Sequence, residues 1–274
     1  MPADEHMLVD LKPLSGWRKW LYSNAVVLAA SIWRILFRWR VRGTENIPRE
    51  GPLIVISNHP SYLDPPTLVG ILIYFGGRDL SIMAWDKLFK IPVVGFWVRS
   101  YRAYPVDRKN PGRGPYQTLL RILSHGGAAG IFPEGSRSKG PLMGEWKPGA
   151  LRAAFASRAT ILPVTMATTG EFWPRHKWRP RLFRRQDIVI HKPMSYEEYM
   201  AGKPAEMHEK QYQELLEERI RAIINEPMIK RHSEFEARKI ALIEARLAPR
   251  HTRRDPGAER RGRYGQAQAR LRGT

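Results

Sequence analysis

A histidine and an aspartate follow a short apolar run in the first quarter of the chain. The run covers residues 53–57, and four residues separate His59 from Asp64. This spacing allows a turn to bring the Asp64 carboxylate to one imidazole nitrogen, which leaves the other nitrogen able to take a proton. A simpler alternative is that Asp64 caps a following helix. Taken alone, the pattern favours neither interpretation.

The chain has no evident nucleophile of its own. It contains no cysteine, and residues 136–140, the nearest approach to a nucleophile elbow, lack the first glycine that this sharp turn needs. A covalent enzyme intermediate is therefore disfavoured. We expect any attacking hydroxyl to belong to a second substrate.

A second polar loop follows the apolar run at residues 129–132. Gly130 and Gly135 have the spacing of a Walker phosphate loop, but Ser136 and Arg137 stand where lysine and serine or threonine are required. Nucleoside triphosphate binding is therefore not expected. Gly135, Ser136 and Arg137 still offer backbone N–H groups, a hydroxyl and a guanidinium to a phosphate or a developing oxyanion. The alternative is an ordinary turn with a solvated arginine.

A further arginine, Arg108, follows the apolar run at residues 103–106. Its guanidinium is a second candidate for binding an anionic group. The alternative is a surface ion pair with its neighbour Asp107, which contributes little to stability.

The elements that must position these residues alternate between strands and helices from about residue 42. Short apolar runs predict strands, and the segments of helical composition between them have Gly or Pro near an end. The expected strands are 53–57, 80–84, 103–106, 129–132, 161–166 and 187–191, and the expected helices are 65–74, 116–124 and 148–157. This alternation predicts an α/β fold with a mixed, partly parallel sheet flanked by helices. Because 274 residues hardly suffice for two enzymatic domains, we expect one catalytic domain over residues 42–200.

The two ends of the chain differ from this middle region in composition. Residues 17–42 mix tryptophan with arginine and lysine, and the apolar run between Lys19 and Arg34 is only 14 residues long. A bilayer crossing needs about 20 residues. We therefore expect residues 1–41 to form membrane-interfacial helices, or alternatively an amphipathic helix packed on its own domain. Residues 201–248 are predicted to be a charged helical extension, and residues 249–274 a disordered basic tail.

The charge of the chain calls for an anionic partner. Lys and Arg number 46 against 26 Asp and Glu, which gives a net charge of +20. Nucleic acid, anionic lipid and a phosphorylated ligand all satisfy this requirement. Residues 172–185 place six cations among four aromatic residues, which suits an anionic lipid surface, single-stranded nucleic acid or a solvated loop over the sheet edge. The absence of cysteine excludes disulfides and is compatible with a reducing cytoplasm.

Four segments, taken in order, resemble the blocks of the PlsC-like glycerolipid acyltransferases. They are Asn58-His59 with four residues before Asp64, an HX4D motif, followed by residues 95–108, 132–137 and 161–164. The resemblance covers about residues 40–194. The best-known members of this family are 1-acylglycerol-3-phosphate acyltransferases.

The resemblance implies a role for each candidate site residue. His59 corresponds to the general base that deprotonates the acceptor hydroxyl, and Asp64 to the residue that orients it. The implied substrate ligands are Arg108 and Arg137 for the acceptor phosphate, Asn58, Glu134, Gly135 and Ser136 around the acceptor, and Pro163 on the acyl-donor side. No metal ligand is expected.

The implied activity is transfer of a fatty-acyl group to a hydroxyl of a lysoglycerolipid, most simply 1-acylglycerol-3-phosphate, to give phosphatidic acid for phospholipid biosynthesis. The donor would be acyl-CoA or an acyl-carrier protein, with no cofactor. The enzyme would lie at the cytoplasmic face of the cell membrane as a peripheral or monotopic protein. Trp85 stands where relatives often have lysine, and Arg102 where they often have glycine. These departures keep open a larger-headed lysophospholipid or a lyso-aminolipid as acceptor. A basic nucleic-acid-binding or membrane-binding protein is the alternative outside enzymes, but it leaves the His59 and Asp64 motif unexplained.

Overall fold

The computed structural model describes most of the chain between residues 34 and 247. The described residues are 16, 24, 27–28, 31–32, 34–100, 102–107, 110, 112–147, 149–173, 179, 181 and 184–247, without the side chains of 97, 172, 239 and 241–247. The chain divides into two compact units, Met1–Ile229 and Lys230–Thr274. The first unit contains the sheet and the candidate site. In the second, the described residues are the last turns of one helix.

The described residues of the first unit form a seven-stranded sheet in the order β1-β7-β6-β2-β5-β3-β4. Its strands are β1 (Trp39–Arg42), β2 (Leu53–Ser57), β3 (Leu80–Trp85), β4 (Tyr104–Val106), β5 (Ala128–Ile131), β6 (Thr160–Met166) and β7 (Gln186–Ile190). Adjacent strands are parallel except for β6 and β7, which are antiparallel. The predicted mixed, partly parallel sheet is confirmed, and each predicted strand lies within one residue of an observed one.

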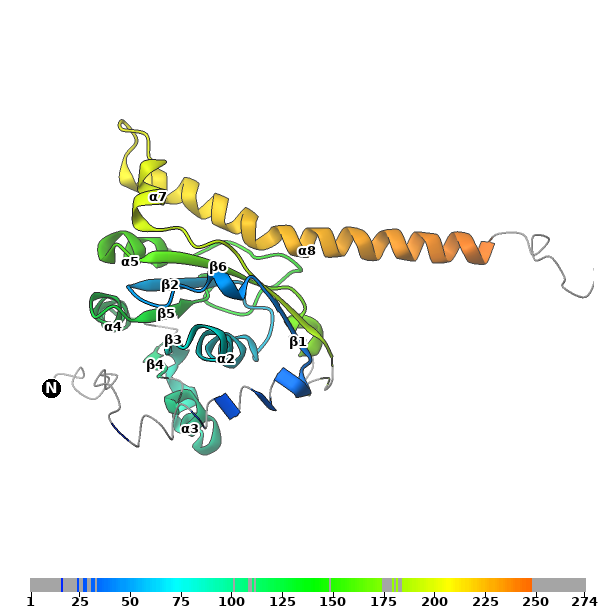
Figure 1. Ribbon diagram of the computed structural model, residues 1–274, viewed down its shortest axis with the longest axis horizontal. Coiled ribbons are helices and arrows are strands. Elements are labelled where there is room, and N and C mark those ends of the chain that lie inside the picture. Colours follow the sequence, from blue (N-terminus) through cyan, green and yellow to red (C-terminus); the bar gives the residue numbers. More distant parts are fainter. Residues whose placement is uncertain are drawn as a thin grey trace, which may run out of the picture. The chain divides into compact units, whose positions relative to one another are not determined.

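Helices cover both faces of this sheet. They are α2 (Asp64–Gly76), α3 (Pro92–Ser100), α4 (Gly114–Ser124), α5 (Ala150–Ser157), α6 (Thr169–Phe172), α7 (Tyr196–Ala201) and α8 (Glu209–Leu247), with short 3₁₀ turns η2 (Thr44–Asn46) and η3 (Asp86–Lys90). Figure 1 shows α5 above the central strands and α2 below them. The composition of residues 86–100 did not reveal η3 and α3, which follow β3 directly.

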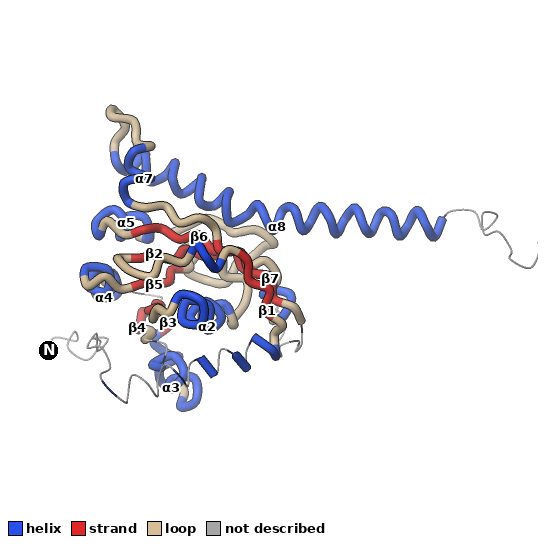
Figure 2. Tube along the Cα trace, in the orientation of Figure 1, coloured by secondary structure: helices blue, strands red, loops and turns tan. Residues whose placement is uncertain are grey.

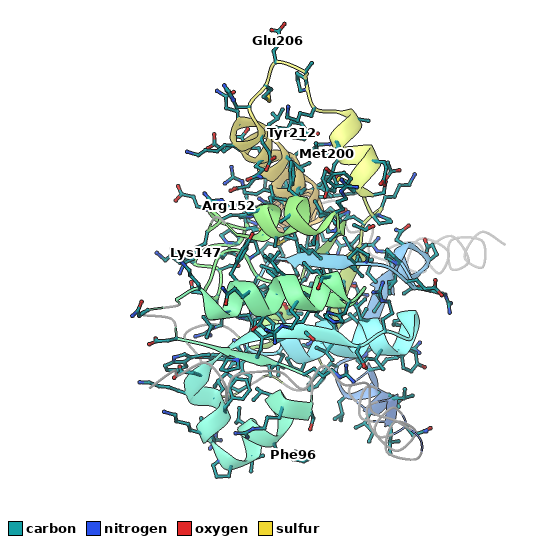
Figure 3. All side chains as sticks on the ribbon, turned by 90° about the vertical axis from the view of Figure 1, so that its left-hand side faces the viewer. Phe96, Lys147, Arg152, Met200, Glu206 and Tyr212 are labelled. Carbon is teal, nitrogen blue, oxygen red and sulfur yellow. The ribbon has the colours of Figure 1, made fainter. Side chains whose placement is uncertain are left out.

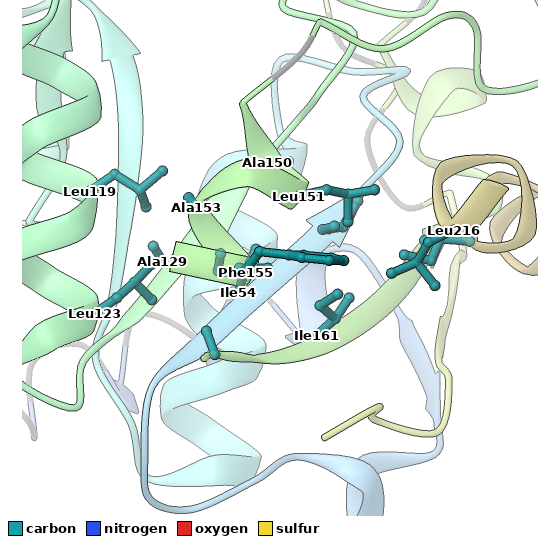
Figure 4. Packing of buried hydrophobic residues seen from close by; sticks show 14 of the residues in the cluster. Ile54, Leu119, Leu123, Ala129, Ala150, Leu151, Ala153, Phe155, Ile161 and Leu216 are labelled. Carbon is teal, nitrogen blue, oxygen red and sulfur yellow. The ribbon is translucent and has the colours of Figure 1, made fainter. Parts of the chain in front are cut away.

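The central strand β2 explains why both faces need a cover. All five of its residues are buried. Ile54 and Ile56 belong to the cluster that packs against α4, α5, α7 and α8, whereas Leu53 and Val55 belong to the cluster that packs against α2. A strand buried on both faces has no polar alternation, as is usual in parallel sheets. Figure 4 shows the first cluster, in which Phe155 and Ile161 lie near Leu216 of α8.

The first half of α8 is part of this core. Four residues at successive intervals of four, Tyr212, Leu216, Ile220 and Ile224, are at most 4% exposed and form one stripe of the helix. The expected boundary of the catalytic domain at residue 200 therefore differs from the compact unit, which extends to Ile229. The surrounding charged residues hid this stripe, because they lower the average hydropathy of a long helix.

The edge strand β1 is a second difference. Residues 39–41 were expected to belong to the helical N-terminal segment, but the helical residues end at Leu36 and Arg38 takes a left-handed conformation with φ 45°. Trp39 and Val41 then alternate with the exposed arginines of β1, a period-two pattern typical of a strand. Figure 2 shows β1 beside β7, with which it pairs in parallel.

The proposed membrane-interfacial helices and the basic tail fall mostly outside the described residues. Most of residues 17–33, all of 249–274 and the centre of the basic loop at 172–185 are not described. Among the residues that are, no helix is both long and apolar enough to span a bilayer.

Candidate active site

The site lies where three parallel strands end at one edge of the sheet. β2 pairs in parallel with β5 on one side and with β6 on the other. The loops that follow them therefore emerge together, which is where open α/β sheets place ligand-binding groups. His59 follows β2, and the loop that contains Glu134 and Arg137 follows β5.

His59 and Asp64 lie in direct contact. The Nδ1 atom of His59 is 2.9 Å from Oδ2 of Asp64, which also accepts a hydrogen bond of 2.6 Å from the backbone N–H of Ser61. Asp64 is fully buried and is the first residue of α2. Leu63 occupies the N-cap position and no side chain caps this end of the helix, so the alternative of a capping role for Asp64 is wrong. The carboxylate points to the imidazole instead.

Local chemistry explains this loop. Pro65 and Pro66 follow Asp64 in the first turn of α2, where a missing N–H costs nothing and the fixed φ suits a helix. Ser61 closes the preceding turn, because its carbonyl accepts from the N–H of Asp64 and its hydroxyl accepts from the N–H of Leu63. The turn thus carries the carboxylate back to the ring five residues earlier in the sequence.

The contact with Asp64 determines which nitrogen of His59 can act as a base. A carboxylate at Nδ1 favours the tautomer with the proton on Nδ1, and the lone pair then resides on Nε2. Within the described part of the chain, Nε2 has no hydrogen-bond partner, and the ring stacks on Phe132 with centroids 4.4 Å apart. The buried Oδ1 of Asp64 also has no partner there. A carboxylate held against one ring nitrogen, with the other nitrogen accessible, is the arrangement in which a histidine can serve as a general base.

Glu134 joins the two loops. Its Oε1 accepts hydrogen bonds from the backbone N–H of His59 at 3.2 Å and from the hydroxyl of Ser138 at 2.7 Å. Its Oε2 accepts from the N–H of Gly144 at 3.2 Å. The N–H of Ser138 in turn donates to the carbonyl of His59 at 2.8 Å. Glu134 therefore holds the His59 loop against the loop that follows β5.

The guanidinium of Arg137 lies over the loop that carries His59. Its Cζ is 3.6 Å from the ring centroid of Tyr62, and its Nη2 donates to the Tyr62 hydroxyl at 2.9 Å. Gly135 turns the chain here with φ +67°, and a Cβ at this position would lie 2.8 Å from the side chain of Lys147. The half-buried Ser136 lies between Gly135 and Arg137 in the sequence. The loop thus places a cation over Tyr62, three residues after the proposed base.

Asn58 and Pro163 are built into the sheet. Asn58 is 1% exposed, and its amide exchanges hydrogen bonds with the backbone of Met166 at 2.7 and 3.2 Å. Pro163 is buried in β6, opposite Ile56 of β2, and its carbonyl accepts from the N–H of His191 at 3.0 Å. Asn58 therefore ties the end of β2 to the end of β6, and the substrate contacts expected of both residues stay predictions. Arg108 falls outside the described residues.

Three residues of the site had not been singled out in the sequence. Tyr62 and Phe132 lie inside the motif segments, but their contacts with Arg137 and His59 cross between loops. The third, Asn225 of α8, accepts a 2.8 Å hydrogen bond from the N–H of Met143 in the loop after β5. Only the tertiary structure reveals a contact between residues 82 positions apart.

Comparison with known proteins places this arrangement in a class. A family model described as Acyltransferase matches residues 38–167, which include the His59–Asp64 pair and the loop with Glu134 and Arg137. A crystal structure of the 1-acyl-sn-glycerophosphate (LPA) acyltransferase PlsC from Thermotoga maritima has the same fold, with a TM-score of 0.56 and 24% identity over 75% of this chain and 78% of that one. The fold and the site thus define an acyltransferase domain.

Two curated relatives agree with this class. The chloroplastic 1-acyl-sn-glycerol-3-phosphate acyltransferase LPAT1 of Arabidopsis thaliana is 29% identical over 162 residues, which are 58% of this chain and 44% of the relative. The 1-acyl-sn-glycerol-3-phosphate acyltransferase of Bacillus subtilis is 32% identical over 126 residues, 46% and 60% of the two chains. The chain spans about half the length of these relatives. Over the matched residues, the chain is similar to the PlsC-like acyltransferases.

The structure adds an observation on one departure noted in the sequence. The resemblance leads us to expect glycine at position 102, and the φ of Arg102 is 51°, a left-handed conformation that glycine adopts without strain. The Arg102 guanidinium lies 3.4 Å from the carboxylate of Asp79. The backbone conformation is therefore present here although the glycine is not.

Proposed function

We propose that the chain transfers a fatty-acyl group from an acyl thioester to the free hydroxyl of 1-acylglycerol-3-phosphate and produces phosphatidic acid. The observation that carries this proposal is the His59–Asp64 contact of 2.9 Å at the end of β2, with Nε2 of His59 left without a partner in the described chain. The names of the curated relatives support the acceptor. The proposal requires no metal or other cofactor, and it places the reaction at the cytoplasmic face of the cell membrane.

The geometry suits direct attack by the acceptor. Nε2 of His59 takes the hydroxyl proton as the oxygen attacks the thioester carbonyl carbon, and Asp64 stabilises the imidazolium that results. A C–O bond forms and the C–S bond breaks. The leaving thiolate then takes the proton from His59, which regenerates the base. No group of the enzyme becomes acylated.

A cation over the loop that carries this base suits a phosphorylated acceptor. Arg137 lies over Tyr62, a residue of the loop that carries His59. The resemblance implies a lysine at position 85, where this chain has Trp85. Lys87 supplies a cation beside that position, since its Nζ lies 5.3 Å from the centroid of the Trp85 ring. A guanidinium binds a phosphate through two parallel hydrogen bonds. We therefore propose Arg137, with Arg108, as the ligands of the acceptor phosphate.

The test is a turnover assay with purified full-length protein. Because the chain contains no cysteine, the thiol released from acyl-CoA can be measured with a thiol reagent without background from the enzyme. We expect thiol release that depends on 1-acylglycerol-3-phosphate and equals the phosphatidic acid formed, and we expect it to survive EDTA. An acyl-carrier protein donor and other lysophospholipids are the comparison arms.

The outcomes separate the alternatives. Faster turnover with a lysophospholipid of larger head group, or with a lyso-aminolipid, would replace the proposed acceptor. Thiol release without any acceptor would indicate a thioesterase and contradict the proposal. So would the absence of turnover with every acceptor and both donors.

A further inference from the structure

The segment between β3 and β4 exposes an unusual amount of apolar surface. Ile91 is 47% exposed, Val93 70% and Phe96 68%. Pro92 and Val94 between them are exposed as well. Figure 3 shows Phe96, a residue of α3, at the lower edge of the view. Single exposed apolar residues are normal on protein surfaces. Several neighbouring ones exposed to this degree usually mark a binding surface.

The inner side of this surface is closely packed. Gly95 faces η3, and a Cβ at this position would lie 2.6 Å from the carbonyl oxygen of Phe89. The same carbonyl accepts a 2.9 Å hydrogen bond from Arg99. The buried side of α3 is therefore packed against η3, whereas Val93 and Phe96 face outward. A surface that is ordered before binding loses little conformational entropy when it binds.

Exposed cations lie in the same segment as the exposed apolar residues. Lys87, Lys90 and Arg99 are all exposed. Between residues 86 and 102 the sequence contains a single carboxylate, the half-buried Asp86. Apolar side chains rimmed by cations suit the boundary between the headgroups and acyl chains of an anionic bilayer. A second copy of this chain is a poorer partner, because its own basic rim would be repelled.

We propose that η3 and α3 form a membrane-contact surface for anionic phospholipid. Ile91, Val93 and Phe96 enter the boundary of the acyl chains, and the three cations bind lipid phosphates. The surface leads into β4, which ends two residues before Arg108 in the sequence. It therefore brings the edge of the sheet that precedes this arginine to the lipid. This inference deepens the proposed function, but its test measures membrane contact and needs no activity.

The absence of cysteine permits a direct test. Val93→Cys and Phe96→Cys are each labelled with an environment-sensitive fluorophore in the full-length chain. Leu215→Cys on α8 is the matched control, because Leu215 is an apolar residue with 50% exposure. On vesicles of phosphatidylcholine with phosphatidylglycerol, the two α3 labels should shift to shorter wavelengths and be quenched by nitroxide-labelled acyl chains. The control label should do neither.

A second measurement gives the size of the effect. Val93→Asp with Phe96→Asp should lower partitioning onto these vesicles at least about tenfold, because two apolar insertions are lost. Leu215→Asp should leave partitioning unchanged, and all three proteins should have the same thermal unfolding midpoint. Pure phosphatidylcholine vesicles and high salt should weaken binding, since both remove the attraction between the cations and the lipid.

Two results would overturn the proposal. In the first, the α3 labels keep their aqueous emission although the protein sediments with the vesicles, so that another segment makes the contact. In the second, the emission shifts with protein concentration in the absence of vesicles, which would identify the surface as an interface between copies of the chain.

Discussion

The two loops that meet at the candidate site are held in place in different ways. Inside the loop from His59 to Asp64, the ring and its carboxylate are oriented toward each other by contacts between residues at most five positions apart. The loop that follows β5 depends on distant residues, since Glu134 binds the backbone of His59 and Met143 binds Asn225. The base and its orienting carboxylate are thus a local structure. The cation near them is positioned by the rest of the fold.

This difference predicts different kinetic consequences. Changes within the His59 loop should act on the chemical step, because they alter the proton acceptor itself. Changes in the second loop should act mainly on the binding of the acceptor. A change in the His59 loop that altered only acceptor binding, or a change in the second loop that altered only the chemical step, would contradict this assignment.

The largest effect is expected for His59→Ala. General-base catalysis contributes a factor of about 10²–10⁴, so kcat should fall by about that factor while the protein remains folded. Steady-state turnover with a check of the circular dichroism spectrum measures both. His125→Ala is the control, because His125 is an exposed histidine at the end of α4. Near-normal turnover of folded His59→Ala would contradict the proposed mechanism. An acyl group trapped covalently on Ser136 or Ser138 would contradict it as well.

Asp64→Asn should lower kcat nearly as strongly. The amide keeps the size of the carboxylate, but it does not favour the Nδ1–H tautomer of His59 or stabilise its imidazolium. Because the two residues act as a unit, the double variant with His59→Ala should be little slower than His59→Ala alone. Turnover of both single variants and the double variant forms the cycle. Losses that multiply in the double variant would mean that the residues act independently.

Arg137→Ala should have a smaller effect, and on a different parameter. A charge-assisted hydrogen bond is worth about 1.5–3 kcal/mol, so the KM for the acceptor should rise by about 10- to 150-fold while the KM for the donor changes little. Arg137→Lys should restore binding poorly, because lysine lacks the planar fork. The matched control is Arg158→Ala, since Arg158 lies over Tyr196 at 5.5 Å. Equal rises of both KM values would contradict a phosphate contact.

The smallest effect is expected for Asn225→Ala. Asn225 accepts from the N–H of Met143, a residue that is 4% exposed. Losing one such hydrogen bond costs about 1 kcal/mol, which should raise the acceptor KM several-fold and lower the unfolding midpoint slightly. Asn225→Asp keeps the acceptor oxygen and should recover most of the KM. Gln213→Ala, on the same helix and with a side-chain amide that donates to Glu209, should change neither quantity.

The fold could be predicted well where the pattern of the sequence is local. Runs such as 53–57 and 161–166 are buried on both faces of the sheet, so nearly every residue in them is apolar. Prediction failed where structure depends on a partner. β1 is a strand because β7 lies beside it, and α3 begins at Pro92 within a segment whose apolar residues remain exposed.

The sequence by itself made the contact between His59 and Asp64 possible, and the resemblance of its four motif segments to a known family favoured this contact over a helix cap. Five positions, with Pro60 and Pro65 limiting the backbone, allow few conformations, and one turn closes the pair. The tertiary structure decided what surrounds them. Glu134 reaches His59 across 75 positions, and Asn58 is bonded to Met166 across 108 positions. Such contacts exist only after parallel strands have brought distant loops to one edge, because sequence separation alone carries no information about which loops will meet.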